Sequence, residues 1–79
     1  MSPTVLRVKN YRFFFFSREE ERPHVHVTCP DGEAKFWLEP IVALQQSVGL
    51  SGKQLRELKA IVEKRRDEIL RAWRAHFQR

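Results

Sequence analysis

The stretch HVHVTCPDGEAKFWL, residues 24–38, decides the fold of this chain. Residues 24–29 alternate between valine and more polar side chains, which is the period of a strand with one buried face. The Pro-Asp-Gly tripeptide at 30–32 is typical of a tight turn, because proline presets φ and Asp-Gly tolerates positive φ. Residues 34–38 are then a second strand. The stretch therefore predicts a β-hairpin.

The residues before the hairpin are rich in β-branched and aromatic types. Lys9-Asn10 interrupts them, so they predict a short segment at Val5–Val8 and a strand at Tyr11–Ser17. Residues 18–23, REEERP, are charged and end in proline, which is typical of an exposed loop. The hairpin is thus expected to have at least one further strand before it.

The residues after the hairpin divide into an ambiguous run and a marked helix. Residues 41–48 fit either a fourth strand or a helical run, and we favour the strand because Gly49 and a helix start follow directly. That start is a capping box formed by Ser51 and Gln54. One helix is predicted over 52–78, and its apolar stripe is interrupted at two arginines. The stripe consists of Leu55, Leu58, Val62, Ile69, Trp73 and Phe77.

These elements predict an α+β fold in which three or four antiparallel strands within 4–48 carry one long C-terminal helix on one face. The chain of 79 residues has the length of a single domain, expected to span 1–79. One cysteine, Cys29, allows no internal disulfide, and no apolar run has the length of a signal core or a membrane span. We therefore expect a soluble cytoplasmic protein with no membrane partner.

A single helix covers only one face of such a sheet. Alternation places the valines of 24–29 under the helix together with Phe36 and Leu38, and leaves a mixed aromatic and basic face opposite. Exposed patches of this kind mark interaction sites or platforms for stacking nucleic-acid bases. A second copy of the chain, or residues 39–50 folding over the face, could also close it. The side chains predicted to bind a partner are Phe14, Phe16, Lys35 and Trp37.

The pair His24 and His26 permits three interpretations. Two imidazoles on one side of a strand can share a metal ion, but no motif fixes a third ligand, so no metal or cofactor is expected. They can also act as the acid and base of a ribonuclease, with Arg12, Arg22 or Lys35 as the cation on the phosphate. In the third interpretation they are structural and only form hydrogen bonds.

The charge balance favours anionic partners. Lys and Arg number 15 against 10 Asp and Glu, which gives a net charge of +5. The sequence contains no Gly-rich phosphate loop, no Ser-His-Asp pattern and no Cys-x-x-Cys motif. The residues predicted to contact RNA or DNA are Arg12, Arg22, Arg71 and Arg74.

Several motifs together resemble a bacterial and archaeal family, the domain of unknown function 4160. They are PTVLR at 3–7, YRFFFFS at 11–17, PHVHV at 23–27, AKFWL at 34–38 and LRELKAIVEKRRDEILRAW at 55–73. The resemblance implies a component of a toxin–antitoxin-type operon that is encoded beside another small protein. We therefore expect a small interaction module that binds that neighbour or a second copy of itself, and RNA or DNA. The alternative is a metal-independent ribonuclease-type toxin that uses His24 and His26.

Overall fold

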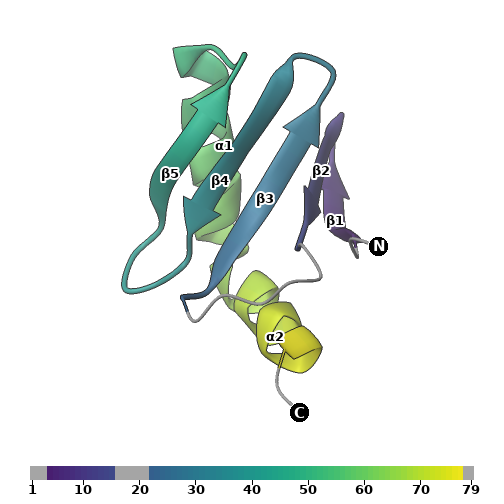
Figure 1. Ribbon diagram of the computed structural model, residues 1–79, viewed down its shortest axis with the longest axis vertical. Coiled ribbons are helices and arrows are strands. Elements are labelled where there is room, and N and C mark those ends of the chain that lie inside the picture. Colours follow the sequence, from purple (N-terminus) through teal and green to yellow (C-terminus); the bar gives the residue numbers. More distant parts are fainter. Residues whose placement is uncertain (1–3, 16–21, 78–79) are drawn as a thin grey trace.

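In the computed structural model the chain forms an antiparallel sheet and two helices, so the predicted α+β class is confirmed (Figure 1). The structure describes residues 4–15 and 22–77. Helix α1 lies behind β4 and β5, and α2 lies beyond one end of the sheet. The strands are β1 Thr4–Val8, β2 Tyr11–Phe14, β3 His24–Cys29, β4 Gly32–Trp37 and β5 Ala43–Val48, and the helices are α1 Gly52–Lys64 and α2 Arg66–Phe77.

The sheet is a meander in which the strand order β1-β2-β3-β4-β5 equals the chain order. The central hairpin pairs β3 with β4 from His24 opposite Trp37 to Cys29 opposite Gly32, which leaves Pro30 and Asp31 as the turn. Gly32 is required there, because a Cβ atom on it would lie 2.0 Å from the carbonyl oxygen of Val48. The turn residues therefore also control how closely β5 approaches β4.

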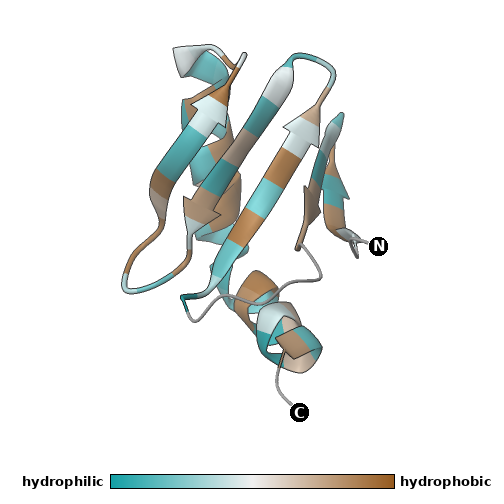
Figure 2. Cartoon of the chain, viewed as in Figure 1, coloured by the Kyte–Doolittle hydropathy of each residue, from teal (hydrophilic) through white to brown (hydrophobic). Residues whose placement is uncertain are grey.

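The core lies between the sheet and the helices. Val25 pairs with Phe36 and Val27 with Ala34, and these side chains alternate with polar ones along each strand (Figure 2). The four residues predicted to face the helix are all buried in one cluster with Leu58 and Val62 of α1. That part of the face assignment is confirmed; the four are Val25, Val27, Phe36 and Leu38.

The structure has five strands where the sequence predicted three or four. The short segment before Lys9 is a full strand, β1, which pairs with β2 across the Lys9-Asn10 turn. Lys9 adopts a positive φ of 56°, which closes this hairpin without a glycine. The run 41–48 contains a strand, β5, as favoured. The predicted strand Tyr11–Ser17 begins correctly and is β2 as far as Phe14, and residues 16 and 17 lie outside the described residues.

The prediction of one helix over 52–78 is wrong, because the chain forms two. The capping box at the start is confirmed, with the Ser51 hydroxyl accepting from the Gln54 amide at 3.1 Å. Helix α1 ends at Lys64, and Arg65 leaves helical geometry with φ −105° and ψ 17°. Arg66 then donates from Nε to the carbonyl oxygen of Leu38 at 2.7 Å, which anchors the start of α2 to the residue that follows β4. Neither helix in the described part of the chain has the length and apolarity needed to cross a membrane.

One surface cluster joins the β1–β2 turn to α1. The Lys9 ammonium and the Tyr11 hydroxyl both donate to the Glu57 carboxylate, the latter at 3.1 Å. The hydrogen bond from Lys9, followed by that from Tyr11, lowers the pKa of Glu57. The pKa of Tyr11 is raised, first by burial and then by the same carboxylate. The edge of the sheet is thereby fastened to the helix layer.

Candidate functional site

Four aromatic rings form a continuous row on the sheet face opposite α1, and we call them the ring row. The ring centroids of Phe14 and His26 are 5.5 Å apart and stacked. Those of His26 and His24 are 5.1 Å apart and edge-on, and those of His24 and Trp37 are 6.0 Å apart. These separations are the ones that aromatic pairs prefer. The ring row therefore crosses three adjacent strands as a connected set of rings.

The strand register explains how the sequence builds this row. His24 and His26 are two residues apart in β3, so they share the face that the valines do not occupy. Phe14 lies opposite His26 in β2, and Trp37 lies opposite His24 in β4. Each histidine is thus flanked by a large ring from a different neighbouring strand. The valines of β3 therefore belong to the core, and its histidines belong to the ring row.

Three cations lie over the rings. The Arg12 guanidinium is 4.7 Å from the centroid of Phe14 at one end of the row. At the other end, the Arg22 guanidinium and the Lys35 ammonium lie 4.3 Å and 4.7 Å from the centroid of Trp37. Cations at these distances are attracted to the ring faces. The candidate site is therefore both aromatic and positively charged.

Hydrogen bonds to neighbouring strands and loops hold two of these cations. Arg12 donates from Nε to the Thr4 hydroxyl at 2.8 Å, and Arg22 donates from Nε to the carbonyl oxygen of Glu39 at 2.8 Å. Each guanidinium thus has one hydrogen-bond partner and also lies over a ring.

The two histidines differ in their exposure. His24 is 2% exposed, and its Nδ1 lies 2.9 Å from the carbonyl oxygen of Arg22. Because a carbonyl oxygen only accepts, Nδ1 carries the proton in this contact. His26 is half-buried and is the imidazole of the pair with surface open to solvent. His24 therefore lies buried within the row, and His26 is the histidine that solvent can reach.

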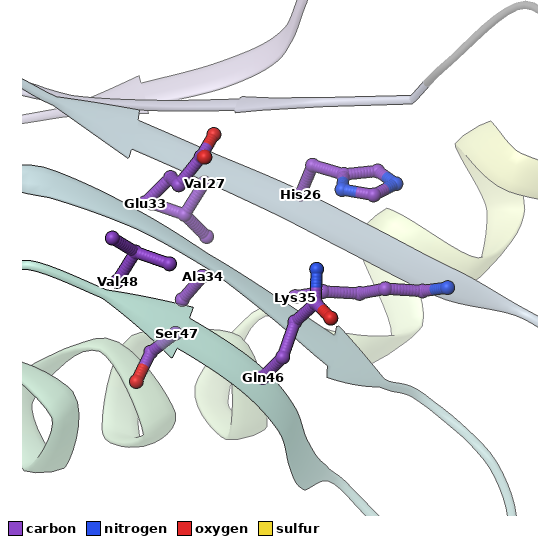
Figure 3. Close-up of a pocket in the computed structure, with 8 residues that line it drawn as sticks. All are labelled: His26, Val27, Glu33, Ala34, Lys35, Gln46, Ser47 and Val48. Atoms are coloured by element: carbon purple, nitrogen blue, oxygen red, sulfur yellow. The ribbon is translucent and has the colours of Figure 1, made fainter.

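A small hollow of about 140 Å³ adjoins the ring row between β3, β4 and β5. Figure 3 shows His26, Lys35 and Gln46 at one end of it and Glu33 and Val48 at the other. Glu33 and Gln46 were not predicted from the sequence as site residues. The alternation within residues 43–48 could have indicated which side chains of this strand share a face. It does not show that Gln46 lies beside Lys35, because that depends on the β4–β5 register. The hollow has room for a few water molecules or one small side chain.

The remaining predicted site residues lie elsewhere. Arg74 on α2 binds the carboxylate of Glu39 at 3.2 Å, and Arg71 is exposed on the same helix. The four arginines predicted to contact nucleic acid are therefore not one group, since only Arg12 and Arg22 belong to the ring row. Phe16 lies outside the described residues. Within residues 4–15 and 22–77, no group of three His, Cys, Asp or Glu side chains is placed to hold a metal ion.

Residues 10–74 match a family model described as a domain of unknown function, DUF4160. The matched span contains every residue of the ring row and the three cations that lie over it. No curated protein and no solved structure matches the chain.

Proposed function

The chain belongs to the DUF4160 family, and from this premise we propose that it is an interaction module that captures a small acidic protein on its ring row. The expected partner is the small protein encoded beside it in a toxin–antitoxin-type operon. This expectation of an operon partner rests on the resemblance described above. The choice of surface and of partner charge rests on the geometry of the face.

One observation carries the proposal: a connected row of four rings, with cations held against both ends, lies on the face opposite α1. Aromatic residues and arginine are enriched in the centres of protein interfaces and among their hot spots. The positive charge over the row complements carboxylates on a partner and speeds its association.

The same geometry favours an acidic protein over stacked nucleic-acid bases. A base needs an open ring face on which to stack. Here Arg22 and Lys35 lie over Trp37, Arg12 lies over Phe14, and Phe14 itself is buried. The ring faces are thus engaged by cations, and guanidinium and ammonium groups are the donors that suit carboxylate oxygens.

The test is the affinity of the purified chain for the purified protein that its neighbouring gene encodes, measured by titration calorimetry. We expect a one-to-one complex that Trp37→Ala weakens by about 30-fold or more, which is the effect of a hot-spot residue near 2 kcal/mol. We expect Arg22→Glu to slow association and to reduce its dependence on salt.

Lys59→Ala, an exposed change on α1, is the matched control and should leave the affinity unchanged. Circular dichroism establishes that each variant folds. The proposal is rejected if the neighbouring protein does not bind, or if Trp37→Ala binds as tightly as the Lys59 control.

A metal-independent ribonuclease is the second candidate function. It is favoured by the 5.1 Å separation of the two imidazole centroids beside Lys35, since an acid, a base and a cation are what cleavage through the 2′-hydroxyl needs. The burial of His24 weighs against it, because a general acid or base must reach its substrate. RNA cleavage by the wild type that is lost in folded His26→Ala would establish this function, and its absence between pH 5 and 8 would reject it.

A further inference from the structure

The exposed apolar side chains of this molecule gather at one place. Across residues 4–15 and 22–77, the large hydrophobic residues that are exposed are Ile41 at 69%, Leu44 at 42% and Val48 at 65%. All three lie in β5 or just before it. Single exposed hydrophobic residues need no explanation, but three along one strand indicate a surface that is covered in use.

The position of β5 in the sheet makes this strand a docking edge. It ends the strand order and pairs with β4 on one side, so its other side has no neighbouring strand among the described residues. An edge strand presents unpaired backbone N–H and C=O groups that another strand can bind. The side of β5 away from β4 is thus able to accept one further strand.

The two edges of the sheet differ in their protection. Both contain a register irregularity, one in the β1–β2 pairing and one in the β4–β5 pairing. The outer strand β1 also carries the exposed Arg7 and is followed by Lys9, and such charges block unwanted strand pairing. In contrast, residues 41–50 contain no charged side chain. The edge at β5 lacks the protection by charge that the β1 edge has.

We propose that β5 pairs antiparallel with β5 of a second copy of this chain, which joins two sheets into one of ten strands, five from each copy. In such a pairing each residue of β5 lies opposite a residue of the same strand. Any charged residue near the axis would then meet its own charge, which is unfavourable. The absence of charge suits a second copy of the strand, whereas an acidic or basic partner segment would find no complementary charge there.

The residues that this pairing places opposite one another also carry no charge. Hydrophobic ends flank the pair Gln45 and Gln46, seen in Figure 2 as a hydrophilic band across the strand. With Gln45 near the two-fold axis, Val48 of each strand lies opposite Val42 of the other, and Leu44 lies opposite Gln46. These pairs are uncharged, and the Val42–Val48 pair at each end is apolar.

This dimer extends the proposed function without depending on it. Antiparallel pairing of identical edges requires a two-fold axis normal to the sheet, so both ring rows lie on the same side of the joined sheet. Pairing of β5 with β5 covers neither ring row, because each row is built on β2, β3 and β4. The dimer therefore offers two equivalent docking surfaces in one plane.

The experiment is sedimentation equilibrium of the full chain from about 1 μM to 500 μM. A single strand pair is a small interface, so we expect a mass that rises with concentration from 9.5 kDa toward twice that value. Gln45→Lys and Gln45→Glu should each raise the dissociation constant several-fold, because both place like charges near the axis. An equimolar mixture of the two variants should restore dimerisation, since opposite charges then meet.

Arg7→Ala on the opposite edge is the matched control and should dimerise as the wild type does. A mass that stays at 9.5 kDa over the whole range overturns the proposal. So does a dimer that resists both Gln45 changes, because the interface then lies elsewhere. Neither result alters the test of the acidic partner, in which Trp37 and not β5 is changed.

Discussion

The two faces of the sheet are built from the same kinds of residue but bury them differently. On the face toward α1, Phe13 and Phe36 pack among valines and leucines and are almost wholly excluded from solvent. On the opposite face, His26 and Trp37 pack against other rings and beneath cations, and both keep exposed surface. Aromatic content alone therefore does not distinguish a core from a binding surface.

The side chains around each ring distinguish the core from the opposite face. A ring among aliphatic side chains gains its stability from the removal of apolar area from water. A ring beneath a guanidinium gains less from burial, and it leaves a charged group at the surface. The first arrangement stabilises the fold, and the second places charged side chains among the rings.

The two faces should differ most in stability at two adjacent residues of β4. Phe36→Ala should lower the free energy of unfolding by about 3–5 kcal/mol, because it leaves a cavity beneath α1. Trp37→Ala removes a larger side chain but should cost much less, because its ring is half-buried on the opposite face. Urea denaturation of both variants measures this, and equal losses would mean that the ring row is part of the core.

A smaller effect should separate the two histidines within the ring row. His24→Phe removes the donor of a buried imidazole from the partly buried hydrogen bond to the Arg22 carbonyl oxygen, so we expect a loss of about 1–3 kcal/mol. His26→Phe is the matched change two residues along β3 and should stay within about 1 kcal/mol, because stacking on Phe14 is kept. Thermal denaturation of both variants compares them, and a more costly His26 change would contradict the difference in burial.

The smallest effect should come from the surface cluster that fastens the sheet to α1. The pKa of Glu57 in the folded chain lies below its ordinary value of 4.5, chiefly through Lys9. The charged carboxylate thus adds stability above about pH 4.5, and this stability is lost as the pH falls through the lower folded pKa. Glu57→Gln should therefore be less stable than the wild type at pH 7, and the difference should close in strong acid. A difference that is independent of pH would show that the carboxylate charge is not its cause.

Much of the fold could be predicted from the sequence because its signals are local. The alternation in residues 24–29 determines which side chains share a face, and this holds in β3. The capping box at Ser51 marks the start of α1 through contacts that span three residues. Alternation also places the two histidines on the same face as Lys35 and Trp37 once β3 is paired with β4.

The features that sequence reasoning missed depend on contacts between distant segments. No proline or glycine marks the end of α1, and the break at Arg65 coincides with the anchoring of Arg66 to the Leu38 carbonyl oxygen. The burial of His24 likewise depends on neighbours from another strand and on the carbonyl of Arg22. The positive φ of Lys9 has no signal of the usual kind, because glycine and asparagine are the residues that favour it.

The meander order of the strands has a consequence for how the chain reaches this structure. Every pairing in the sheet joins strands that are consecutive in the chain, so the sheet can grow hairpin by hairpin through short loops. Chains dominated by such local pairings fold faster than sheets of the same size with distant pairings. The contact between Lys9 and Glu57 is not local, because it spans 48 residues. We expect the docking of α1 onto the β1–β2 turn to be the late event, so that substitutions in this contact speed unfolding and leave the folding rate nearly unchanged.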